Sequence, residues 1–108
     1  MDEKGKTLIL ERLKEKLNIT WKDERTDSKL KNIIDDAELI VNHKLGAEVD
    51  NSAPENAIGR VLFLNYCMYV WNDCTEDFDK AYLSEIQIAR GFYEVKENEE
   101  KEENSGIE

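Results

Sequence analysis

The sequence has very few residues that break helices. Its 108 residues include one proline and five glycines, too few for the closely spaced turns of a small β domain. Charged residues make up 37% of the chain and hydrophobic residues 40%, a balance that favours long helices. We therefore expect a single all-α domain with a modest core, for which self-association would be helpful.

Cysteine and histidine are also scarce. The cysteines are Cys67 and Cys74, and seven residues of one helix would place their Cα atoms about 10 Å apart, beyond disulfide reach. The single histidine, His43, is distant in sequence from both, so the close ligand pairs of a structural zinc site are missing. We expect reduced thiols, with Cys67 as a small core residue, and neither a metal site nor a cofactor.

Basic residues are outnumbered by acidic ones. The chain has 15 Lys and Arg against 25 Asp and Glu, for a net charge of -10, and this disfavours tight binding to nucleic acid, which depends on cations displacing counterions. The residues after Met1 are mostly charged, with no signal-peptide apolar region. The longest apolar segment, 61–71, is too short to cross a bilayer. A cytoplasmic protein without membrane contact is expected.

The sequence also lacks a catalytic motif. His43 has no serine, cysteine or carboxylate beside it at a recognisable catalytic spacing, and a place near a helix C-terminus, where positive charge is favourable, explains it structurally. Asp35 and Asp36 are adjacent, and Asp77 and Asp79 are two residues apart, spacings at which helical side chains do not face each other. We therefore expect no enzyme activity and no catalytic residues.

The centre of the chain is a nearly all-apolar segment. Across residues 61–71 only Asn65 is polar, so a helix here is apolar on nearly every side and should be covered on nearly every side. Ser52 and Glu55 have the spacing of a capping box, and Pro54 suits a first helical turn. The sequence predicts that this central helix begins near residue 53 and is the third of about four.

The segments before the central helix each have an apolar stripe on one face. Helical spacing predicts a first helix from a cap at Thr7 to about Leu17. A second helix should begin at Thr26 or Asp27 and end before Gly46, a natural left-handed residue past a helix C-terminus. One stripe of each helix is expected to be buried in a small bundle.

A fourth helix is expected after the central one. Thr75 can cap it, and the acidic residues in its first turn would interact favourably with the positive end of the helix dipole. Its inner stripe is expected to comprise Phe78, Tyr82, Ile86, Ala89 and Tyr93, widened by Ile88 and Phe92.

Aromatic residues are the candidates for a binding interface. Trp21 stands in a loop otherwise rich in charge; it could anchor a partner, since Trp is enriched at binding hot spots, or close one end of the bundle. Aromatic side chains in the second half of the chain could serve a core or an interface equally well. The candidate interface residues are Trp21, Tyr69, Trp71, Phe78, Tyr82, Phe92 and Tyr93.

The composition changes at residue 94. Residues 94–108 carry seven Glu against two Lys, too polar a segment to offset the entropy of ordering. We expect residues 1–93 to be the folded helical domain and residues 94–108 to be a flexible acidic tail, which either orders on a partner or only solubilises the chain. The candidate docking residues of this tail are Glu97, Glu99, Glu100, Glu102 and Glu103.

The core positions and the helix order, taken together, resemble a known family. The pattern comprises Leu13, the run Leu17, Asn18, Ile19, Thr20 and Trp21, then Asp27, Leu30, Ile33, Ile34, Ala37, Ile40 and Gly46, and finally Leu64, Tyr66, Cys67, Tyr69, Phe78, Tyr82 and Leu83. Over about residues 7–93, the chain resembles the head-to-tail connector family (head completion proteins, DNA-packaging adaptors) of long-tailed double-stranded DNA phages and prophages.

The resemblance implies a structural role. Proteins of this family are small and helical, and they form a ring on the portal vertex that provides a channel for DNA and a docking face for tail components. It implies a homo-oligomeric ring, with the portal protein and further head-completion or tail proteins as partners. DNA would pass through without specific binding, and the protein would move from the host cytoplasm to the head–tail junction of the virion. C-terminal segments of such connectors can engage the portal.

The acidic composition also permits a different function. A small acidic helical protein could be a regulatory binder of the DNA-mimic type, which occupies the basic site of another protein. Such a mimic would concentrate its carboxylates on one folded face, whereas the densest acidic run in this sequence lies in the expected tail.

In the isolated protein, the amide hydrogens of residues 97–103 should exchange rapidly with solvent. The segment has too little apolar surface to offset the entropy of ordering. Hydrogen exchange followed residue by residue tests this, with the amides of the central helix as the protected reference. Strong protection of residues 97–103 in the free monomer would contradict the prediction.

Overall fold

The chain is all-helical in the computed structural model, which describes the backbone of residues 1–105 and the side chains of residues 1–99. The helices are α1 (Glu3–Lys16), α2 (Glu24–Leu45), α3 (Ala57–Trp71), α4 (Phe78–Ala81) and α5 (Leu83–Ser105), with 3₁₀ turns η1 (Pro54–Asn56) and η2 (Thr75–Asp77). Residues 1–105 include no strand, and the expected all-α class is confirmed. Five helices replace the expected four because the last one is interrupted at Tyr82, whose φ of -118° and ψ of 19° are not helical.

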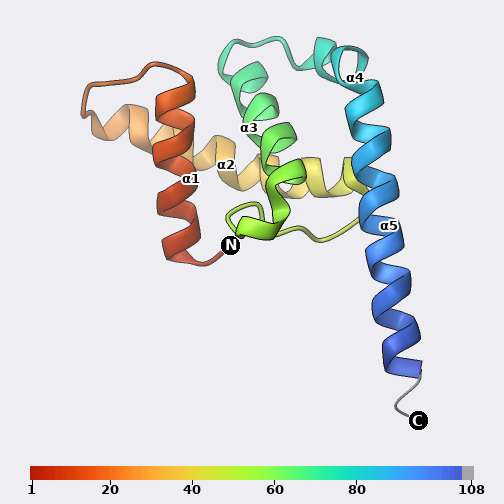
Figure 1. The fold of residues 1–108 in the computed structure, drawn as a ribbon. Coiled ribbons are helices and arrows are strands. Elements are labelled where there is room, and N and C mark those ends of the chain that lie inside the picture. The colour runs from red at the N-terminus through yellow and green to blue at the C-terminus, as the bar shows by residue number, and fades with distance from the viewer. Residues whose placement is uncertain (106–108) are drawn as a thin grey trace.

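The other three long helices all pack on α2. It runs across the molecule, and α1, α3 and α5 cross it on the same side (Figure 1). The molecule is 17 Å across in its thinnest dimension, which fits two layers of helices about 8–10 Å apart. The second half of α5 extends beyond the body of the molecule (Figure 1).

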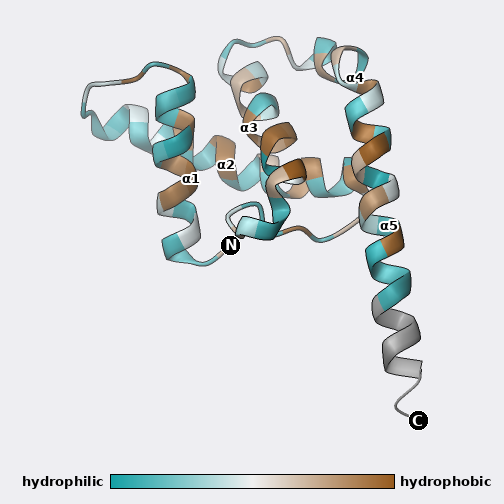
Figure 2. Cartoon of the chain, viewed as in Figure 1, coloured by the Kyte–Doolittle hydropathy of each residue, from teal (hydrophilic) through white to brown (hydrophobic). Residues whose placement is uncertain are grey.

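The core lies where these helices cross α2. Leu30, Ile34, Ala37, Val41 and Leu45 of α2 recur at helical spacing and are almost fully buried. The crossing helices contribute Ile9, Leu13, Phe63, Cys67 and Ala89, joined by Phe78 at the start of α4. Figure 2 shows hydrophobic residues where α5 passes the body and mainly hydrophilic ones where it extends beyond.

Asp2 and Asp23 cap the first two helices, in place of the expected Thr7 for the first and the expected Thr26 or Asp27 for the second. Asp2 accepts a hydrogen bond from the Gly5 amide at 2.7 Å, so α1 begins before Thr7, whose hydroxyl donates to a carbonyl of the preceding turn. Asp23 caps α2 by accepting from the Arg25 amide at 3.3 Å. A carboxylate also complements the positive end of the helix dipole, which explains why the aspartates take this position.

The capping box expected at the start of the central helix does not form. The amide and the hydroxyl of Ser52 donate to the Asp50 carboxylate at 3.0 and 2.6 Å, a turn in which the carboxylate bonds the backbone two residues on. Pro54 stands in the first turn of η1, and α3 follows it. Gly46 has the expected left-handed conformation, with a φ of 68°.

α3 is less enclosed than its composition predicts. Phe63 and Cys67 are fully buried, whereas Val61 is 60% exposed, Ile58 is 43% exposed and Leu64 is only partly buried. α1, α2 and α5 all pack on α3, but none of them covers the face opposite α2. The expectation that this helix is covered on nearly every side is therefore wrong.

α5 crosses the expected domain boundary at residue 94 without interruption and is helical through Ser105. The change in composition therefore does not end the helix. The mobility expected for this segment in solution stays a prediction. Neither α5 nor any other helix within residues 1–105 combines the length and the apolarity that a membrane span needs.

A buried polar contact joins α5 to the start of α3. The Tyr93 hydroxyl donates to Asn56 Oδ1 at 3.2 Å, and Asn56 Nδ2 donates to the Asp50 carbonyl at 2.9 Å. Burial raises the pKa of Tyr93, so the hydroxyl keeps its proton. Gly59 permits this approach, because a Cβ there would lie 2.9 Å from Tyr93 Oη and 3.1 Å from Asn51 Oδ1.

Replacing Gly59 by alanine should lower the free energy of unfolding by about 1–3 kcal/mol, because the added methyl displaces packed side chains. The matched control is Gly91→Ala on α5, where a Cβ meets no atom within 4 Å. That variant should be neutral or more stable by up to about 1 kcal/mol, since alanine favours helix. Denaturant unfolding measures both. A Gly59→Ala protein as stable as Gly91→Ala would contradict the contact.

Candidate interaction surfaces

Three of the candidate interface residues form an internal aromatic cluster. Phe78 is 1% exposed, its ring stacks on Tyr82 at 5.0 Å between centroids, and the Tyr69 ring meets both of them edge-on. Tyr69 and Tyr82 are partly buried in the same cluster. Phe78 therefore belongs to the core, and the cluster joins the end of α3 to α4 and the start of α5.

The other aromatic candidates divide between the core and the surface. Tyr93 is 4% exposed and is a core residue. Trp71 is partly buried, with Lys29 Nζ 4.7 Å from its ring centroid. Trp21 does not close the end of the bundle: it is 52% exposed, and Ile19 is the buried apolar residue of that loop. Trp21 and Phe92 are thus the candidates whose rings are the most accessible.

An apolar stripe on α5 faces away from the body. Ile88, Phe92 and Val95 are 68%, 43% and 58% exposed, and their spacing of four and three residues places them on one side of the helix. At about 100° per residue, this side lies away from the buried Ile86 and Tyr93. The expectation that Ile88 and Phe92 widen the inner stripe is therefore wrong. We call Ile88, Phe92 and Val95 the α5 stripe.

Val95 was not among the residues expected at an interface. The change to acidic composition at residue 94 placed it in the expected flexible tail, outside the helical domain. Its helical spacing from Ile88 and Phe92 was the available signal. Reading the apolar spacing across residue 94 would have found it.

A second apolar stripe lies on the uncovered face of α3. The exposed residues Ile58 and Val61 are followed along the helix by the partly buried Leu64 and Met68. Their spacings of three and four residues place them along one side of the helix. We call Ile58, Val61, Leu64 and Met68 the α3 stripe. The sequence did not predict the α3 stripe, because in a helix that is apolar on every side the composition does not indicate which side will face solvent.

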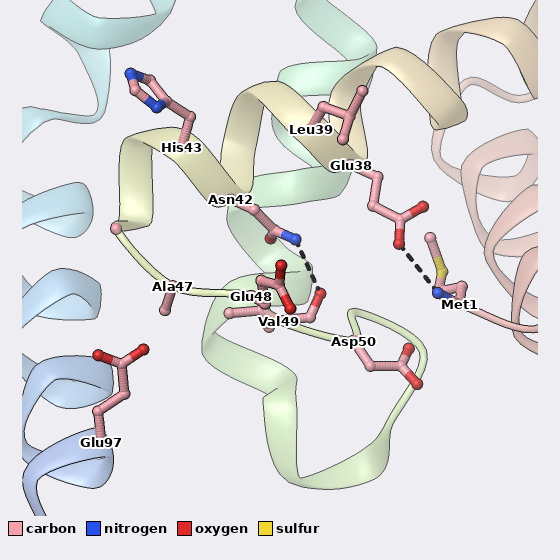
Figure 3. A pocket seen from close by; sticks show the side chains of 11 residues that line it. Met1, Glu38, Leu39, Asn42, His43, Ala47, Glu48, Val49, Asp50 and Glu97 are labelled. Carbon is pink, nitrogen blue, oxygen red and sulfur yellow. Dashed lines mark hydrogen bonds and ion pairs between the residues drawn. The ribbon is translucent and has the colours of Figure 1, made fainter.

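A groove of about 860 Å³ collects acidic side chains from three parts of the chain. Glu38 of α2 lies on one side, Glu97 of α5 on the other, and Glu48 and Asp50 come from the loop between α2 and α3 (Figure 3). The Met1 amine donates to Glu38 at 3.0 Å, and this hydrogen bond raises the pKa of the amine. We call this the acidic groove.

One carboxylate of the acidic groove is held ionised by its own loop. The Asp50 carboxylate accepts hydrogen bonds from Ser52, and these bonds lower the pKa of Asp50. The carboxylate is therefore ionised at neutral pH. Asn42 Nδ2 donates to the Val49 carbonyl at 3.4 Å and ties α2 to the loop. His43 stands at the edge of the groove, away from Glu38 and Asp50 (Figure 3). The groove thus presents negative charge from Glu38, Glu48, Asp50 and Glu97.

The two thiols differ in their surroundings, Cys67 being buried and Cys74 partly exposed. Burial raises the pKa of Cys67 to about 12, so this thiol is protonated at neutral pH and a poor nucleophile. Cys67 and Cys74 are both free, as expected. Within the described residues, no group of three or more His, Cys, Asp or Glu is placed to hold a metal ion.

The candidate docking residues of the acidic segment are only partly described. Glu97 lines the acidic groove, and Glu99 borders a hollow beside Phe92 and Val95. The side chains of Glu100, Glu102 and Glu103 lie outside the described residues.

Comparison with protein-family models, with curated proteins and with solved structures finds no match to this chain. The main surface features of the fold are the two apolar stripes and the acidic groove.

Replacing Phe78 by alanine should lower the free energy of unfolding by about 3–5 kcal/mol, as expected for loss of a fully buried ring. Phe92→Ala is the matched control, because it removes the same side chain from an exposed site. It should change stability by about 1 kcal/mol or less. Denaturant unfolding of the two variants compares them directly. Equal losses would show that Phe92 belongs to the core and not to a free surface.

Proposed function

We propose that this protein is a structural subunit of a phage head–tail connector, which assembles as a ring on the portal vertex, extends the DNA channel and provides a docking face for tail components. The observation that carries this proposal is the pair of apolar stripes that a small helical domain leaves exposed on α3 and α5. Apolar side chains gathered on one surface mark interaction sites. Two different stripes on one chain permit head-to-tail contacts, which form a ring when the rotation from one subunit to the next closes.

The helix order supports the same proposal. A short first helix, a long second helix ending at Gly46 and an apolar third helix follow in the order that accompanies the resemblance to connectors. The partners would be the portal protein and further head-completion or tail proteins. The protein would act first in the host cytoplasm and then at the head–tail junction of the virion.

The net charge of -10 fits a protein that lets DNA pass without holding it. A negative channel wall repels phosphates and keeps the polymer sliding. The same charge opposes the association of many copies in solution, so the free protein would be monomeric or weakly associated and would form a ring when a portal templates it. Added salt screens this repulsion and should increase self-association.

The acidic groove favours a second function. Glu38, Glu48, Asp50 and Glu97 gather carboxylates on one folded face, which is the property expected of a DNA mimic that occupies the basic site of a regulatory protein. The ion pair between the Met1 amine and Glu38 neutralises part of this charge. The mimic is therefore the weaker proposal.

Electron microscopy of the purified protein mixed with its cognate portal-containing heads tests the connector. A ring of density should be added at the portal vertex, and its absence at saturating protein would overturn the proposal. In a parallel pull-down from host lysate, a Glu48→Lys variant serves as the control for the groove. Capture of a DNA-binding regulator by the wild type and not by Glu48→Lys would favour the mimic.

A further inference from the structure

The loop between α2 and α3 buries one asparagine completely. Asn51 is 0% exposed, and within the described residues neither its Oδ1 nor its Nδ2 has a hydrogen-bond partner. A buried polar group that has lost its bonds to water is costly unless the protein replaces them. Because no part of Asn51 is accessible to solvent, a partner for its side chain has to be a neighbouring group of the chain.

A hydroxyl of α5 lies close to this side chain. A Cβ at Gly59 would be 2.9 Å from Tyr93 Oη and 3.1 Å from Asn51 Oδ1, so the two oxygens approach the same point on the first turn of α3. The Tyr93 hydroxyl has one proton, which it donates to Asn56 Oδ1 at 3.2 Å. This distance is long for a hydroxyl donor, which is found most often at about 2.7–2.8 Å from its acceptor. Tyr93 therefore has a long bond to one asparagine and the unpaired acceptor of another beside it.

The two asparagines differ in what could replace the Tyr93 hydroxyl. Asn56 and Tyr93 line a pocket of about 310 Å³ between the loop and α5, so water in this pocket can reach the side chain of Asn56. Its Nδ2 donates to the Asp50 carbonyl at 2.9 Å, a bond that does not involve Tyr93. Asn51 has no such access to water. If the hydroxyl moved from Asn56 to Asn51, water would replace it at Asn56, and both side-chain oxygens would then have a partner.

We propose that Tyr93, Asn51 and Asn56 form a two-position latch between α5 and the loop. In one position, which the structure shows, the Tyr93 hydroxyl donates to Asn56, and in the other it donates to Asn51. Each position contains one hydrogen bond from the same hydroxyl, so their free energies are similar and both positions are populated. Gly59 makes the latch possible, because a Cβ at this place would crowd both oxygens.

The position of the latch affects the acidic groove. Tyr93 is 4% exposed and packed in the core, so its hydroxyl changes acceptor together with a small displacement of this part of α5. Glu97 is four residues further along, on the same side of the helix, and it lines the acidic groove with Glu48. A change of acceptor therefore changes how Glu97 faces the carboxylates of the loop. The latch is a property of the fold and does not depend on assembly at a portal.

A set of substitutions tests whether the Tyr93 hydroxyl can donate to Asn51. Asn56→Leu removes the acceptor that the hydroxyl uses in the structure, and Asn51→Leu removes the second one with little change in volume. Tyr93→Phe is then introduced into Asn56→Leu and into the Asn51→Leu/Asn56→Leu double variant, and the melting temperatures are compared. The double variant is the matched control, because the Gly59 amide also bonds the Tyr93 hydroxyl and that bond is present in both backgrounds.

In Asn56→Leu the hydroxyl should donate to Asn51. Tyr93→Phe should therefore lower the melting temperature by about 4–8 °C in this background, the shift expected for the loss of about one hydrogen bond. In the double variant the hydroxyl has no asparagine acceptor, so the same substitution should have a clearly smaller effect. Equal effects in the two backgrounds would overturn the latch, because they would show that Asn51 does not bond Tyr93.

A measurement on the wild-type protein decides the question if Asn56→Leu does not fold. The side-chain carbonyl carbon of an asparagine moves downfield in NMR spectra when its oxygen accepts a hydrogen bond. Comparison of the wild type with Tyr93→Phe should therefore show upfield shifts of the Cγ resonances of both Asn51 and Asn56. A shift at Asn56 alone would overturn the latch. Assembly at the portal vertex is measured separately, so failure of the connector proposal would leave this result unchanged.

Discussion

Burial of one face of α2 is the interaction on which the rest of the structure depends. Its apolar residues recur at helical spacing from Leu30 to Leu45, and α1, α3 and α5 all cross it on this face (Figure 1). Full burial of a large apolar side chain is worth about 1.5–3 kcal/mol, so this line of residues contributes several kcal/mol to the stability of the fold. The crossing helices hold their positions because each of them contributes to the same core.

One layer of crossing helices on α2 leaves the outer side of that layer uncovered. α3 and α5 are both apolar on more than their core-facing side, and a chain of 108 residues has no further helix among its described residues to place over them. The exposed stripes are therefore a direct consequence of the architecture. Both helices therefore keep apolar side chains open to solvent.

The buried polar contacts position α5 relative to α3. The hydrogen bond from Tyr93 to Asn56 and the close approach at Gly59 set the position of α5 along α3. They therefore also set the position of the α5 stripe. The acidic groove arises from the same arrangement, since it lies between α2, the loop after it and Glu97 of α5. The position of α5 on the core thus also determines where Glu97 lies in the acidic groove.

The sequence by itself determined the all-α class, the helix order and the left-handed turn at Gly46, because helical spacing and glycine conformation are local properties. It also determined that Cys67 and Phe78 lie in apolar surroundings. The tertiary structure decided whether Trp21 was buried. It also decided which sides of α3 and α5 remained open. Those outcomes depend on which neighbour covers each side of a helix. An apolar sequence pattern shows which surface a helix could bury, but it does not show how many neighbouring helices will cover that surface.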